Sequence, residues 1–176
     1  MFLSPNTRGQ ENLFWPVMEA AGWLRIPKID RTPSEKLAEI CLNVAYEGPF
    51  ELLFYTYYAF PTDYPEDIRS IFGKEFFNQT IQPEAADEFR KTIREEDVQA
   101  VVTFNKGIFN LVAEEKIDLP IEKLKAGALI QSKVKDVEVS LPLYLTFPTG
   151  WRYDKEYFAL RTSSLEKIKV AIALGF

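Results

Sequence analysis

Apolar positions follow a helical spacing in some segments of the chain and form extended runs in others. Apolar residues three and four apart, often after a capping residue or a proline, predict helices. These helices begin near Asn12, Pro33, Asp63, Gln82, Asn105 and Ser163. Short apolar runs between turn residues are typical of strands. The predicted strands cover residues 2–4, 50–60, 98–104, 128–130 and 137–147.

Local start and stop signals mark several of the predicted helices. Residues 32–35 (TPSE) and 163–166 (SSLE) form capping boxes, in which a Ser or Thr and a Glu three residues later satisfy free backbone N–H groups. Gly22 is placed to end the first helix. Cys41 lies on the apolar stripe of the second helix, so we expect it to be a buried small hydrophobic residue.

Strands that alternate with helices predict a mostly parallel sheet covered on both faces. In such folds, ligands bind beyond the carboxyl ends of the strands. Three polar loops follow predicted strands, at residues 4–9 (SPNTRG), 105–107 (NKG) and 147–152 (FPTGWR). Each loop is also explained by turn formation, or by Asn105 capping the next helix. Their shared position after strands makes them the candidate site.

Composition narrows the chemistry. The chain has 176 residues, of which 47% are hydrophobic, and this suits a single domain over residues 1–176 with a sizeable core. The absence of histidine excludes His-based catalytic triads, HExxH zinc sites and His-ligated haem. The single cysteine, Cys41, excludes a disulfide framework and a Cys-ligated iron–sulfur cluster. We expect no metal and no cofactor, and chemistry by carboxylates, amides, hydroxyls, Lys, Arg and backbone dipoles.

The net charge of −5 is unevenly distributed along the sequence. Residues 60–100 carry ten acidic and five basic side chains, whereas residues 133–169 carry five acidic and seven basic ones. A polyanion would therefore have to bind a local face of the protein. No apolar run approaches the roughly 18 residues of a membrane span, so we expect no membrane partner. The first residues lack the pattern of a secretory signal, which predicts a cytoplasmic protein.

Three segments, in order along the chain, resemble the motifs of one family. Residues 11–22 (ENLFWPVMEAAG) are similar to a helix with the pattern N-x-F-W-x-x-L-x-x-x-G. Residues 100–109 (AVVTFNKGIF) resemble a strand and turn, A-V-x-F-N-G-K, and residues 144–152 (YLTFPTGWR) resemble a closing loop, P-[N/M]-P-S-[G/S]-x-x-R. The family is the mismatch-specific uracil/thymine DNA glycosylases of the uracil-DNA glycosylase superfamily. The resemblance implies a three-layer α/β/α sandwich with a mostly parallel central sheet.

The resemblance also implies an activity. Such an enzyme acts as a monomer without a cofactor, flips a uracil-type base out of DNA and hydrolyses its N-glycosidic bond in base excision repair. Asn6 matches the catalytic residue that orients the attacking water. Asn105 would bind the edge of the flipped base. Phe14, or an aromatic residue of segment 54–58, would stack on that base.

The same resemblance assigns the DNA contacts. Thr149 matches a phosphate-contacting Ser, and Lys106 lies in the middle motif as a DNA-binding cation. Gly150, Trp151 and Arg152 match the wedge that fills the space left by the flipped base. An aromatic ring beside a guanidinium suits that role, because rings stack on any base and Arg pairs with phosphate.

Two other interpretations stay open. In this chain Pro5 and Asn6 stand in the reverse of the family's order, and Phe147 stands where one branch of the family has Asn. Together with the acidic balance, these differences favour a catalytically silent nucleobase- or nucleic-acid-binding domain on the same fold. The third interpretation is an unrelated α/β protein whose aromatic residues only fill its core.

Overall fold

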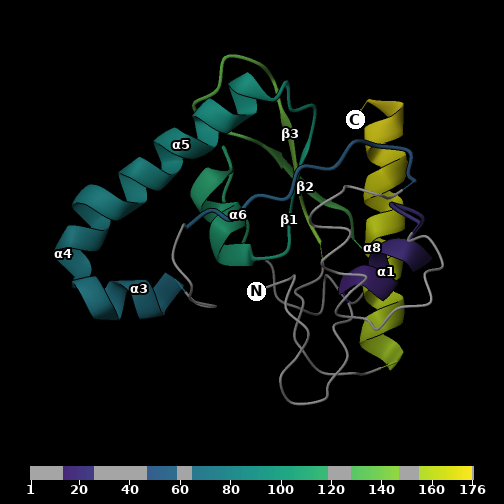
Figure 1. Ribbon diagram of the computed structural model, residues 1–176. Helices are drawn as coiled ribbons and strands as arrows, with labels where there is room; N and C mark the ends of the chain where they lie inside the picture. The colour runs from purple at the N-terminus through teal and green to yellow at the C-terminus, as the bar shows by residue number, and fades with distance from the viewer. Residues whose placement is uncertain (1–13, 26–46, 59–64, 119–127, 147–154, 176) are drawn as a thin grey trace.

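The computed structural model describes residues 14–25, 47–58, 65–118, 128–146 and 155–175 (Figure 1). These residues form helices and a small sheet. The strand predicted at residues 2–4 and the helix predicted to begin at Pro33, which contains Cys41, lie outside the described residues.

The sheet has three strands in the order β1-β3-β2. They are β1 (Val101–Thr103), β2 (Ile130–Lys133) and β3 (Pro142–Leu145). Strands β1 and β3 are parallel, with Thr103 opposite Leu145, whereas β2 and β3 are antiparallel. The β2–β3 connection is short and contains no helix. It is too short for the crossover of a dozen or more residues that two parallel strands need, so β2 and β3 are antiparallel. Among the described residues the sheet is therefore mixed.

Both faces of the sheet are packed against helices (Figure 1). Leu143 and Leu145 of β3 belong to a buried cluster with residues of α5 (Gln82–Glu95) and α6 (Lys106–Val112). Tyr144, which points to the other face, belongs to a cluster with α1 (Phe14–Ala20) and α8 (Lys155–Leu174). The period-two alternation of β3 thus sends neighbouring side chains to different helix layers.

Helix α8 runs without a break through the predicted capping box at residues 163–166, so the helix start predicted there is wrong. Arg161, Leu165 and Ile168 are buried at spacings of four and three residues, which places them on one face of a continuous helix. Trp23 fastens this helix to the chain after α1 by donating a hydrogen bond from Nε1 to the Leu165 carbonyl at 2.9 Å. Packing on the sheet outweighs the local start signal.

The end of α1 agrees with the sequence. Gly22 follows the helix with a φ of +66°, a left-handed conformation that favours glycine, so the predicted stop is confirmed. A Cβ at this position would lie 2.7 Å from Lys169 Nζ, which itself donates to the Ala21 carbonyl at 2.7 Å. A side chain at this position would therefore displace the flexible end of Lys169.

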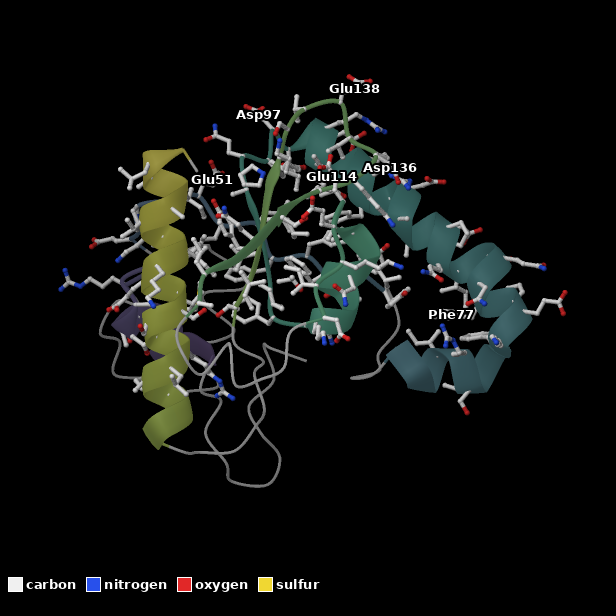
Figure 2. The ribbon with its side chains drawn as sticks, turned by 180° about the vertical axis from the view of Figure 1, so that it is seen from behind. Glu51, Phe77, Asp97, Glu114, Asp136 and Glu138 are labelled. Atoms are coloured by element: carbon white, nitrogen blue, oxygen red, sulfur yellow. The ribbon has the colours of Figure 1, made fainter. Side chains whose placement is uncertain are left out.

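A helical arm leads into α5. It consists of α3 (Pro65–Phe72), α4 (Lys74–Phe76) and the π-helix η1 (Phe77–Ile81), with Gly73 at a φ of +80° between the first two. Ile68, Phe77 and Ile81 bury their side chains with Tyr58, and Figure 2 shows Phe77 at the bend of the arm. The helix predicted to begin near Asp63 is found as α3. The helix predicted from Gln82 is found as α5, but η1 continues into it without a break, so the helix start predicted at Gln82 is wrong.

The strand predicted at residues 50–60 is not found over residues 50–58, which the structure describes. Ring contacts hold this segment instead: Phe50 packs on Trp23, and Tyr55 and Tyr57 pack on Phe89, with centroids 5.3 to 5.6 Å apart. Its aromatic side chains are bound to partners in different clusters, and this replaces a regular strand ladder.

Candidate functional site

The carboxyl ends of β1 and β3 define one edge of the sheet, here called the carboxyl edge. The backbone N–H of Thr146 donates to the Thr103 carbonyl at 3.0 Å, so the last residues of both strands lie side by side. Asn105 follows β1 at this edge, and the chain leaves β3 after Thr146 at the same edge. The loops expected at residues 105–107 and 147–152 therefore start from neighbouring strands.

Asn105 is the N-cap of α6, as one of the two sequence interpretations predicted. Its Oδ1 accepts a hydrogen bond from the backbone N–H of Ile108 at 3.1 Å. Its own backbone N–H donates to Thr103 Oγ1 at 3.2 Å, which ties the cap to the end of β1. A Cβ at Gly107 would lie 3.0 Å from Asn105 Oδ1, so glycine leaves room for the cap. The cap uses the carbonyl oxygen of the side chain, and the Nδ2 amide group is the remaining donor.

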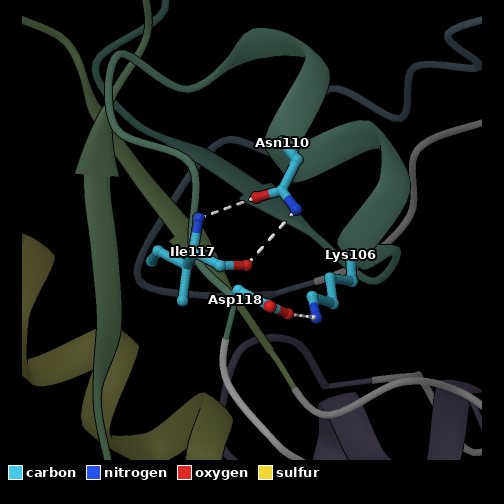
Figure 3. Close-up of polar contacts among 4 residues, drawn as sticks. All are labelled: Lys106, Asn110, Ile117 and Asp118. Atoms are coloured by element: carbon cyan, nitrogen blue, oxygen red, sulfur yellow. Dashed lines mark hydrogen bonds and ion pairs between the residues drawn. The ribbon is translucent and has the colours of Figure 1, made fainter.

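Lys106, the first residue of α6, forms an ion pair with Asp118. Its Nζ donates to Asp118 Oδ1 at 3.0 Å, and Asp118 is fully exposed. Asn110, one turn further along α6, binds the backbone of Ile117 twice (Figure 3). Its Oδ1 accepts from the Ile117 N–H at 2.9 Å, and its Nδ2 donates to the Ile117 carbonyl at 3.3 Å. Sequence reasoning missed Asn110 and Asp118, because neither lies in a motif.

The segment between α6 and Asp118 is also fastened to β2. The Glu114 N–H donates to the Lys133 carbonyl at 2.8 Å, and the Lys135 N–H donates to the Val112 carbonyl at 2.9 Å. The Glu115 N–H donates to Ser132 Oγ at 3.2 Å. These bonds and the Asn110 contacts hold residues 113–118 from both ends.

Thr146 and Arg161 are the buried polar side chains of the part of the chain that the structure describes, with exposures of 1% and 4%. Thr146 Oγ1 donates to Ser164 Oγ at 3.3 Å. Arg161 lies on the same face of α8, one turn before Ser164. Both buried polar groups thus belong to the region of the carboxyl edge. Sequence reasoning did not single out Arg161, because arginine is usually solvated.

The opposite edge of the sheet is acidic. Asp97 lies ahead of β1, and Asp136 and Glu138 lie between β2 and β3; Figure 2 shows all three at the same end of the molecule. Arg90 compensates part of this charge, since its guanidinium lies 3.5 Å from Asp136 and 2.6 Å from Asp87. At the carboxyl edge, Lys106 supplies a positive charge whose partner is Asp118.

Tyrosines carry the clearest pKa shifts. Burial raises the pKa of Tyr57 to about 12, with a further increase from the neighbouring Tyr58 and an opposing effect of Arg90. Burial also raises the pKa of Tyr55 and of Tyr144. These phenols stay protonated near neutral pH and can only act as hydrogen-bond donors or acceptors. No group of three His, Cys, Asp or Glu side chains suited to a metal ion occurs among the described residues.

Most residues of the predicted site belong to segments that the structure does not describe. Asn6, Thr149, Gly150, Trp151 and Arg152 lie outside the described residues. Phe14 begins α1, but its side chain is likewise outside the described set. Of the predicted site, the structure thus brings Asn105 and Lys106 to the carboxyl edge and leaves the other positions untested.

Comparison with known proteins adds no relative: no protein-family model, curated protein or solved structure matches the chain. Within the described ranges, every helix is too short or too polar to cross a bilayer.

Proposed function

We propose that the chain is a nucleic-acid-binding α/β protein of the uracil-DNA glycosylase superfamily, with a three-layer α/β/α sandwich. Helices packed on both faces of the sheet support this fold. More narrowly, we propose a uracil-type DNA glycosylase, which extrudes a deaminated base and hydrolyses its N-glycosidic bond.

One observation carries the proposal: two of the three resembling segments start from adjacent parallel strands at one edge. Thr103 and Leu145 are register partners, so Asn105 and the chain after Thr146 begin close together. Ligands of α/β sheets bind at such an edge. A site shared by the two segments is the arrangement that base binding needs.

The orientation of Asn105 suits a uracil-type base. Because Oδ1 is occupied by the helix cap, the base edge would meet the Nδ2 donor. Thymine and uracil present a carbonyl oxygen at C4, whereas cytosine presents an amino group, which is also a donor. A fixed donor therefore favours uracil over cytosine. As the bond breaks, negative charge grows on the departing base, and one well-placed donor contributes on the order of 3 kcal/mol to such a transition state.

The remaining roles follow the resemblance. Asn6 would orient the attacking water, and Lys106 and Thr149 would contact phosphates. Trp151 and Arg152 would fill the vacated position in the base stack.

The alternative, a catalytically silent nucleobase- or nucleic-acid-binding domain, is favoured by the reversed order of Pro5 and Asn6, by Phe147 and by the acidic balance of the chain.

The test is an excision assay on uracil-containing single-stranded and double-stranded oligonucleotides, read on a denaturing gel. We expect the wild type to cleave and Asn6→Ala to lose cleavage while retaining its circular dichroism spectrum. Asn78→Ala changes an exposed Asn of η1, on the arm, and serves as the matched control that keeps activity. Binding without cleavage of uracil, mismatched thymine, xanthine or hypoxanthine would instead establish the silent binding domain.

A further inference from the structure

The Lys106–Asp118 ion pair joins two residues that backbone hydrogen bonds hold close together. The two residues are twelve positions apart, and Nζ lies 3.0 Å from Oδ1. Asn110 binds both backbone groups of Ile117, the residue directly before Asp118 (Figure 3). The carboxylate is therefore presented to the ammonium by a fixed backbone.

The support for Asp118 extends to the sheet. Val112, Glu114 and Glu115 are hydrogen-bonded to β2 or to Lys135, which follows it. Helix α6 itself is anchored by Phe109, which is fully buried. Both partners of the ion pair thus stand on ordered backbone at the carboxyl edge.

The attraction between Lys106 and Asp118 is weak enough for another anion to displace the Asp118 carboxylate. Both side chains are exposed, at 44% for Lys106 and 105% for Asp118, so water and salt screen their attraction. A DNA phosphate is likewise an anion that accepts hydrogen bonds from Lys, and the polyanion brings several phosphates to the surface at once. A phosphate and the Asp118 carboxylate would compete for one ammonium group.

We propose that Asp118 limits the affinity of the carboxyl edge for nucleic acid by occupying Lys106 until a backbone phosphate replaces it. This inference rests on the proposed function, because it assumes that Lys106 contacts DNA. Asp118 then acts as a specificity-determining residue: it lowers binding that depends on the phosphate alone and leaves base contacts by Asn105 unaffected.

The test is a double-mutant cycle of DNA affinity, measured by fluorescence anisotropy with a labelled uracil-containing oligonucleotide at fixed salt. The variants are Asp118→Asn, Lys106→Met and the double variant. We expect Asp118→Asn to bind about two- to five-fold more tightly, as for the loss of one exposed ion pair. In the Lys106→Met background the same change should have a smaller effect, no larger than that of net charge alone.

Asp136→Asn is the matched control. Asp136 is an exposed, ion-paired Asp at the opposite edge of the sheet, and its φ of +58° is one that Asn also adopts readily. It removes the same charge, so it reports the effect of net charge alone, and we expect a smaller change than for Asp118→Asn. Asn110→Ala, which releases Ile117, should tighten binding in the same direction as Asp118→Asn.

The possible failures are distinguishable. Equal effects of Asp118→Asn and Asp136→Asn on DNA affinity would overturn the inference. An undiminished effect of Asp118→Asn in the Lys106→Met background would also overturn it. In either case, excision by the wild type would leave the proposed function intact. No binding and no excision by either the wild type or Asp118→Asn would overturn both. Because Asp118 is fully exposed, loss of folding does not obscure the result.

Discussion

Asn105 is expected to have two separable roles, as the cap of α6 and as the donor to a flipped base. The cap depends on Oδ1, which accepts from the Ile108 N–H at 3.1 Å, and base binding depends on Nδ2. Asn105→Ser keeps a capping oxygen and removes the amide donor. Asn105→Ala removes both groups.

The expected magnitudes differ between stability and activity. Loss of an N-cap to Ala costs about 1 kcal/mol, whereas Ser caps about as well as Asn. For a chain of 176 residues, about 1 kcal/mol lowers the melting temperature by roughly 2–4 °C. Loss of the donor should slow excision by roughly a hundredfold or more in both variants.

The assay pairs urea unfolding, followed by tryptophan fluorescence, with single-turnover excision of uracil. We expect Asn105→Ala to lose stability and activity, and Asn105→Ser to lose activity alone. Full excision by Asn105→Ser would show that Asn105 only caps the helix and would refute the base-donor role. Unchanged stability of Asn105→Ala would refute the contribution assigned to the cap bond.

Three further outcomes follow from the geometry. Lys106→Met should reduce the slope of log affinity against log salt by about 0.7–0.9, the effect of one phosphate contact, and an unchanged slope would remove Lys106 from the DNA interface. Phe109→Ala, at a fully buried position, should lower the free energy of unfolding by about 3–5 kcal/mol in urea titrations, and a loss below 1 kcal/mol would contradict its burial. Between pH 10 and about 12 the unfolded chain loses the Tyr57 proton that the folded protein keeps, so stability should fall as pH rises; Tyr57→Phe should show a shallower fall, and an equal fall would contradict the raised pKa.

Helices with strong local signals were predictable from the sequence. Asn105 caps α6, as its position after a strand suggests. Gly22 ends α1 in the left-handed conformation that its type allows. In each case the deciding interaction is made within a few residues, so a sequence window contains it.

Features that depend on distant packing were not predictable. The capping box at residues 163–166 lies inside α8, because the buried stripe of Arg161, Leu165 and Ile168 continues across it. The aromatic run at residues 50–58 is held by rings from other elements and forms no strand. Strand β2 pairs with β3 in the antiparallel direction, and the spacing of apolar residues does not indicate the direction of a strand.

The candidate site shows the same division. The position of Asn105 and Lys106 at a strand end was predictable, because polar residues gather at strand ends in α/β folds. Asp118 was not, since its contact with Lys106 depends on the Asn110–Ile117 hydrogen bonds and on the bonds to β2. A residue that reaches its site through hydrogen bonds between distant parts of the chain has no local sequence pattern.

Helix α6 joins the proposed roles in one rigid unit. Within two turns it carries the Asn105 cap, the Lys106 cation and the Asn110 contacts, and Phe109 and Val112 anchor it in the core. Because these groups share one backbone, a substitution in the core should displace the base donor and the phosphate-binding cation together. Side-chain substitutions at Asn105 and Lys106 should instead separate base selectivity from salt-dependent affinity. Under the proposed function, base recognition and charge attraction would therefore be distinct properties that depend on the same buried anchor.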